Sequence, residues 1–115
     1  RWERLIWTSS EAVEKLEAAG DAPGRASVLK RLSTAYLRSY YLDPEEALNA
    51  GKQALNLYKE LGDKRGEATA LECVASALLQ MKDGMKESLR AVNKALALSK
   101  DIGDKQGELS ACSML

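Results

Sequence analysis

Apolar side chains recur along most of the chain at steps of three and four residues, the spacing of one face of an α-helix. Charged residues fall mostly on the opposite face. The pattern predicts helices over 2–19, 25–41, 44–61, 67–82 and 85–102, and the start of another over 108–115. In the helix over 85–102 the apolar stripe includes Met85, Leu89 and Ile102, so we expect all three to be buried. No segment alternates with the period of a strand, and the fold class predicted is all-α.

A short turn sequence occurs three times in related form. Its copies are Gly20-Asp21-Ala22-Pro23-Gly24, Gly62-Asp63-Lys64-Arg65-Gly66 and Gly103-Asp104-Lys105-Gln106-Gly107, at intervals of 42 and 41 residues. We expect the first Gly to close a helix in the left-handed conformation, the Asp to form the turn, and the second Gly to open the next helix. The interval predicts one domain, 1–115, with a half repeat over 1–24, full repeats over 25–66 and 67–107, and a new repeat over 108–115.

The two full units can be aligned residue by residue. Leu29, Leu32, Ser33 and Tyr36 correspond to Leu71, Val74, Ala75 and Leu78, and Ala47, Gly51 and Ala54 correspond to Ser88, Val92 and Ala95. Small residues recur where two helices would cross closely, and large ones recur where a neighbouring unit would pack. A helix pair of this kind hides its apolar stripe only when it is stacked on the next pair.

This pattern resembles the tetratricopeptide repeat family, through Leu29-x-x-Leu32-Ser33-x-x-Tyr36 followed by Ala47 and Ala54, and through their counterparts in the second unit. Two features depart from the usual motif: the family period is about 34 residues, and no proline closes the second helix of either unit. In both features the sequence resembles the long-helix variant found in kinesin light chain and nephrocystin-type arrays. The resemblance implies a right-handed α-solenoid of antiparallel helix pairs, with two full repeats and a half repeat at each end.

The resemblance also implies a concave groove, lined by the first helix of each pair, that binds a peptide or a helix of another protein. Polar and apolar residues on the expected groove face of these two helices are the candidate partner-binding residues. They are Ser27, Lys30, Thr34, Leu37 and Arg38 in one unit, and Thr69, Glu72, Ser76, Leu79 and Gln80 in the next. Lys30 matches one position of the carboxylate clamp that some family members use for chaperone tails, but Thr34 and Cys73 stand where that clamp has Asn.

Two aromatic features lie outside that groove face. Trp7 aligns with Asn49 and Arg90, which are outward positions, so we expect it to contact another protein or a preceding helix, with simple exposure as the alternative. Tyr40 and Tyr41 come where the helix over 25–41 ends, either at the groove rim or in ordinary packing.

Apolar residues also gather near the last position of the sequence. Leu109, Cys112, Met114 and Leu115 begin an apolar helix that has no partner within the sequence. A stable array needs a polar terminal unit. We therefore expect further chain or another molecule to cover this end, and association of identical chains through exposed ends is one form of such cover.

Composition narrows the functional classes. The 17 basic and 17 acidic residues balance, so nothing favours nucleic acid as a partner. The chain has no His, which removes the usual general base and the commonest metal ligand. Cys73 and Cys112 match no metal or redox spacing, and we expect both to be small buried side chains in a reducing compartment. The sequence contains no run of about 18 apolar residues, so it predicts no membrane span.

These observations predict a non-catalytic protein–protein interaction module with no cofactor or metal: a scaffold, an assembly factor or an auxiliary subunit of a larger complex. It would bind a peptide, a helix or the subunits of that complex through the groove or the exposed ends. The alternative is a regulatory segment of a larger multidomain enzyme or signalling protein. The expected location is intracellular, with the cytoplasm as the default and an organelle, after removal of a transit peptide, as the other option.

Overall fold

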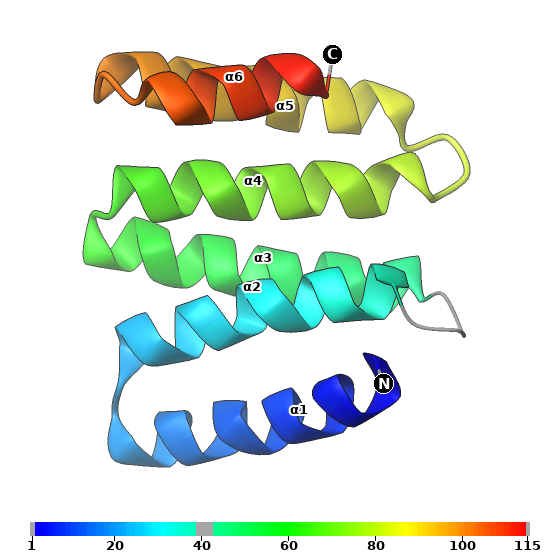
Figure 1. Cartoon of the computed structure of the whole chain (residues 1–115), viewed down its shortest axis with the longest axis vertical. Coiled ribbons are helices and arrows are strands. Elements are labelled where there is room, and N and C mark those ends of the chain that lie inside the picture. The colour runs from blue at the N-terminus through cyan, green and yellow to red at the C-terminus, as the bar shows by residue number, and fades with distance from the viewer. Residues whose placement is uncertain (1, 39–42, 115) are drawn as a thin grey trace.

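Each helix of this protein packs against the next helix along the chain, and neighbouring helices run in opposite directions (Figure 1). The computed structural model describes residues 2–38 and 43–114. Within these ranges it contains α1 (Trp2–Ala19), α2 (Ala22–Arg38), α3 (Pro44–Leu61), α4 (Lys64–Leu79), α5 (Met85–Asp101) and α6 (Lys105–Ser113). The all-α prediction is confirmed.

The helices form two rows. Helix α4 contacts α2 on one side and α6 on the other, whereas among the described residues α1 does not contact α3, and α3 does not contact α5. The row of α2, α4 and α6 is therefore close-packed, and the row of α1, α3 and α5 is spread apart. Figure 1 views the molecule with the close-packed row toward the reader. The radius of gyration is 13.7 Å, and a compact domain of this length has about 13 Å.

The repeated turn sequence ends one helix and caps the next. Gly62 is left-handed, with φ of 71°; its N–H donates to the Lys59 carbonyl, and the Asp63 N–H donates to the Tyr58 carbonyl. These two bonds form a Schellman motif, which satisfies carbonyls that the helix end would leave unpaired. The Asp63 carboxylate then accepts the Gly66 N–H at 3.0 Å, as a helix N-cap.

The other two copies repeat this arrangement. Gly20 and Gly103 have φ values of 75° and 68°. Asp21 accepts the Gly24 N–H at 3.0 Å, and Asp104 accepts the N–H of Gly107 at 3.1 Å. The same short hydrogen-bonded unit therefore reverses the chain at all three places.

These caps correct the predicted helix starts. The sequence predicted starts at 25, 67 and 108, but the helices begin at Ala22, Lys64 and Lys105. The Asp is already the N-cap, so the second Gly lies in the first turn of the helix and does not open it. The predicted start of α3 is confirmed, with Asp43 accepting the Glu46 N–H at 3.1 Å and Pro44 in the first turn.

Small residues fill the contacts within each helix pair, as predicted. The alanines at 35, 47, 54 and 75 are completely buried. In the pair of α2 and α3, the Ser33 hydroxyl donates to the Ala47 carbonyl at 2.6 Å. In the pair of α4 and α5, the Ser88 hydroxyl donates to the Ala75 carbonyl at 3.0 Å. Each pair is thus joined by one buried hydrogen bond from a hydroxyl to a backbone carbonyl, which satisfies the serine without a polar partner side chain.

Part of the predicted apolar stripe of α5 is exposed, and that prediction was wrong. Met85 and Leu89 are 66% and 44% exposed, and Ile102 is 36% exposed. Helix α6 has nine residues and covers only the C-terminal half of α5 (Figure 1). Met85 and Leu89 lie in the uncovered half, and Ile102 lies in the turn beyond the helix end.

We predict that Gly66→Ala lowers the free energy of unfolding by about 1–3 kcal/mol, because an added Cβ would overlap the Tyr58 ring. Tyr58 is buried, so the ring has little room to move. Urea unfolding followed by circular dichroism measures the change.

Gly24→Ala is the matched control, since Gly24 has the same cap position but a Cβ there would meet only the Asp21 side chain. We expect Gly24→Ala to change the free energy of unfolding by less than about 1 kcal/mol. Equal losses in the two variants would show that contact with Tyr58 does not constrain this turn.

Candidate functional site

Five of the ten predicted groove residues line one hollow on the close-packed face, between α2 and α4. We call this hollow, of about 340 Å³, the inner groove. Its lining residues are Ser33, Thr34, Leu37, Arg38, Glu72, Cys73 and Ser76. Positions 34, 37 and 38 share one face of α2, and positions 72, 73 and 76 share one face of α4, because residues three and four apart are neighbours on a helix. The contact between α2 and α4 brings these two faces together.

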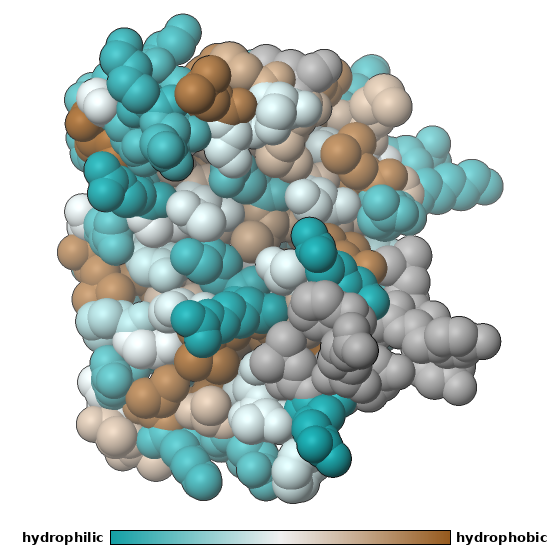
Figure 2. Space-filling view, viewed as in Figure 1, coloured by the Kyte–Doolittle hydropathy of each residue, from teal (hydrophilic) through white to brown (hydrophobic). Residues whose placement is uncertain are grey.

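The surface around the inner groove is mainly polar. Figure 2 shows the face formed by α2, α4 and α6, with α1 along its lower edge: in the coloured part, hydrophilic residues and residues of neutral hydropathy predominate, and hydrophobic residues form separate groups. Within the groove the Thr34 hydroxyl donates to the Lys30 carbonyl of its own helix, at 3.3 Å. The groove therefore offers hydroxyl, guanidinium and carboxylate groups beside one leucine.

The other predicted residues, Ser27, Lys30, Thr69, Leu79, Gln80 and Trp7, do not line the inner groove. Lys30 lies beside it, and its charge acts on both Glu72 and Cys73. Gln80 is exposed at the C-terminal cap of α4, beyond the groove. Trp7 lies on α1 and is 65% exposed, in agreement with its outward position in the sequence alignment, and among the described residues α1 contacts only α2.

The Glu72 carboxyl group is held in an unusual environment. Burial raises its pKa, and the charge of Asp104 raises it further, whereas a hydrogen bond with Ser110 and the charge of Lys30 lower it. Desolvation is the largest of these effects, because it disfavours the ionised form. Glu72 therefore couples the inner groove to α6, which carries Ser110 and begins after Asp104.

The two cysteines differ in environment. Burial raises the pKa of the Cys73 thiol, against smaller opposing effects of a hydrogen bond with Thr34 and the charge of Lys30. A thiol with a raised pKa stays protonated and is a poor nucleophile. Cys112 is exposed, so the prediction that both cysteines are buried was wrong for this residue. It lies on α6, where no further helix in the described chain covers the outer surface.

Residues 2–38 and 43–114 contain no group of three His, Cys, Asp or Glu side chains placed to hold a metal ion. Tyr40 and Tyr41, the predicted groove-rim pair, lie outside the described residues.

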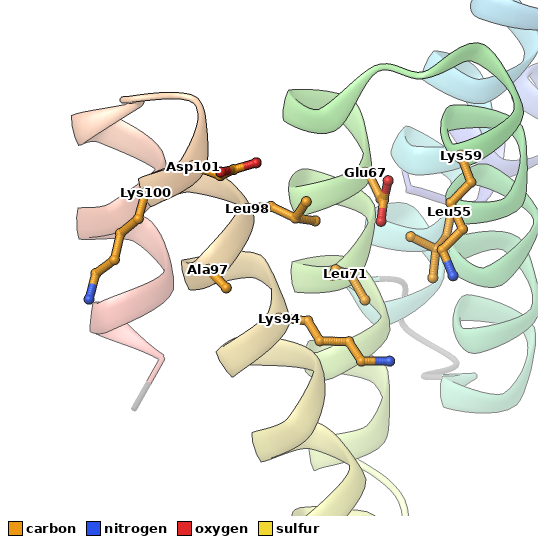
Figure 3. Close-up of a pocket in the computed structure, with 9 residues that line it drawn as sticks. All are labelled: Leu55, Lys59, Glu67, Leu71, Lys94, Ala97, Leu98, Lys100 and Asp101. Carbon is orange, nitrogen blue, oxygen red and sulfur yellow. The ribbon is translucent and has the colours of Figure 1, made fainter.

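A larger hollow lies on the opposite face, between α3, α4 and α5, and no sequence pattern pointed to it. We call this hollow, of about 810 Å³, the outer groove (Figure 3). Its lining residues are Leu55, Lys59, Glu67, Leu71, Lys94, Ala97, Leu98, Lys100 and Asp101. The sequence places its lysines at polar positions of amphipathic helices, which ordinarily face solvent, so spacing alone gave no signal for a shared site.

Comparison with known proteins assigns no family to this fold. No family model matches the chain, and no curated protein matches it either. Across the described ranges, each helix is too short or too polar to cross a bilayer.

We predict that Glu72→Gln is more stable than the wild type at pH 7. The raised pKa means that the folded protein binds a proton at Glu72 more readily than the unfolded chain does. Ionisation of Glu72 therefore lowers the stability of the fold as the pH rises from the pKa of Glu72 in the unfolded chain through its higher pKa in the folded protein. Urea unfolding of both proteins at several pH values measures the difference.

The advantage of Glu72→Gln should vanish below about pH 4, because the wild-type carboxyl group is then protonated in both states. Glu11→Gln, at an exposed position on α1, is the control and should show no such pH-dependent difference. A difference for Glu72→Gln that stays constant across this pH range would contradict the assigned effect of burial.

We predict that a thiol reagent modifies Cys112 in the native protein at least about tenfold faster than Cys73, because exposure and thiolate content control the rate. Mass spectrometry of the tryptic peptides over time measures both rates. In urea the two rates should converge; a faster reaction at Cys73 in the native protein would place that thiol in an open environment instead.

Proposed function

We propose that this protein is a non-catalytic interaction module that binds a peptide segment of another protein in the inner groove. In this proposal the helix pairs are tetratricopeptide-like repeats of a right-handed α-solenoid, and α2, α4 and α6 form its concave row. The groove is formed in the folded chain, so a peptide would bind without ordering the protein first.

One observation supports the proposal most directly: residues from two successive helix pairs line the same hollow. Thr34, Leu37 and Arg38 come from α2, and Glu72 and Ser76 come from α4. A repeat protein that binds along its row of first helices needs this arrangement, because successive units must present side chains to one ligand. The contact of α4 with both α2 and α6 supports a continuous row.

The polar groups of the groove indicate the kind of peptide. Lys30 and Arg38 are eight residues apart along α2, about two turns, and each attracts a carboxylate on the ligand. The hydroxyl of Ser76 and the carboxylate of Glu72 suit a ligand backbone that brings N–H and C=O groups to them. We therefore infer a peptide with an acidic side chain directed toward α2 and its backbone directed toward α4.

The test begins with affinity capture from a cell extract, followed by identification of the retained protein and mapping of the bound peptide. The double variant Lys30→Glu, Arg38→Glu should bind that peptide at least about fivefold more weakly, because charge reversal turns attraction into repulsion. Isothermal titration calorimetry measures the affinity, and circular dichroism verifies that helix content is unchanged.

The matched control is Lys52→Glu, Arg90→Glu, which reverses one lysine and one arginine at exposed positions on α3 and α5. It should bind the peptide as the wild type does. Equal binding by the wild type and by Lys30→Glu, Arg38→Glu would move the peptide site away from the inner groove.

A further inference from the structure

The outer groove has an apolar floor. Leu55 comes from α3, Leu71 from α4 and Leu98 from α5, and Figure 3 shows that the three side chains turn into the space between the helices. The space exists because, within the described ranges, α3 and α5 do not contact each other, which leaves this side of α4 uncovered by a helix. Ala97 adds a small exposed side chain at the edge of the floor. Its volume, about 810 Å³, is in the range of known ligand sites.

Two lysines reach over this floor from opposite sides. In Figure 3 the Lys94 side chain extends from α5 toward α3, and the Lys59 ammonium lies beside Leu55, whereas Lys100 points away from the groove. Neither Lys59 nor Lys94 belongs to an ion pair within the part of the chain that the structure describes.

The acidic residues of the groove lie toward one end of it. The Asp101 carboxylate is already engaged with the Lys64 ammonium at 2.6 Å. Glu67 belongs to the first turn of α4, where the positive end of the helix stabilises a carboxylate. The Lys94 end of the apolar floor is therefore positively charged, and it favours a ligand that brings negative charge.

The corresponding hollow one repeat earlier does not share these features. It lies between α1, α2 and α3, has a volume of about 230 Å³, and is lined by Glu14, Glu46 and the Tyr36 side chain, among others. In the repeat register, Gln53 occupies the position of Lys94 and Glu17 that of Lys59. The two cations are thus a property of the outer groove and not of the repeat.

We propose that the outer groove binds a short amphipathic helix of a partner protein that carries two leucine-sized side chains on one face and carboxylates beside them. The groove follows α5 from Lys94 to Asp101, a length of about 10 Å at 1.5 Å per residue. Apolar side chains at i and i+3 or i+4 are about 5–6 Å apart on a helix, so two of them fit along the floor. The carboxylates face Lys59 and Lys94. This is the helix-in-groove mode of recognition.

The test uses the full chain labelled with ¹⁵N and two synthetic helical peptides with leucines at i, i+3, i+4 and i+7. One peptide carries glutamates beside the leucines, and the other carries lysines there. The acidic peptide should shift the amide signals of Leu55, Leu71 and Ala97, and it should bind at least about fivefold more tightly than the basic peptide.

Three variants separate charge from shape. Lys94→Glu should weaken binding of the acidic peptide at least about fivefold, and the variant should prefer the basic peptide. Lys86→Glu, at an exposed position on the first turn of α5 that does not line the groove, should leave that preference unchanged. Ala97→Trp should block both peptides by filling the groove; since Ala97 is exposed, the core has no need to rearrange.

Three results would overturn the proposal. One is binding of the acidic peptide with unchanged affinity after Lys94→Glu. Another is a set of shifts confined to inner-groove residues such as Thr34 and Ser76. The third is shifts at Leu55 and Leu71 that arise from raising the protein concentration without peptide, because a second copy of the chain would then be the occupant.

Discussion

The close approach of the two helices in each pair is the constraint on which the rest of this structure depends. Ala35, Ala47 and Ala75 are fully buried at the contacts, and a Cβ added to Gly51 of α3 would lie 3.4 Å from Ser33 Oγ of α2. Interiors packed this closely do not absorb larger side chains without backbone shifts. A shift of α3 would move α4 away from α2, and the two walls of the inner groove would no longer face one another.

The three- and four-residue spacing of apolar positions located all six helices, because a helix that buries one face must repeat at that spacing. The helix starts after each Gly-Asp were three residues late, since the role of Asp21, Asp63 and Asp104 as N-caps depends on a hydrogen bond and not on hydrophobicity. Exposure of Met85 and Leu89 was missed for another reason: burial of a stripe depends on the length of the helix that covers it, and α6 is short.

The sequence pointed to residues of the inner groove but not to the outer groove. The sequence alignment of the two units predicted which residues of α2 and α4 share a side, and Thr34 and Ser76 line one hollow. The outer groove depends on the separation of α3 and α5, which no residue spacing encodes. Lys94 and Arg90 are both exposed cations on α5. Lys94 lines the outer groove and Arg90 does not, and this difference depends on where α3 lies.

The buried serines have a consequence for how the helices find their partners. Ser33 aligns with Ala75 and Ala47 with Ser88, so donor and acceptor are exchanged between the two pairs. If α4 took the place of α2 beside α3, Ala75 would meet Ala47 and no such bond would form. If α5 took the place of α3 beside α2, Ser33 and Ser88 would place two hydroxyls at a crossing that holds one. Two helix pairs of similar shape therefore differ in which helix supplies the hydroxyl, and an exchange of α2 for α4 beside α3 would lose one buried hydrogen bond, worth about 0.5–1.5 kcal/mol.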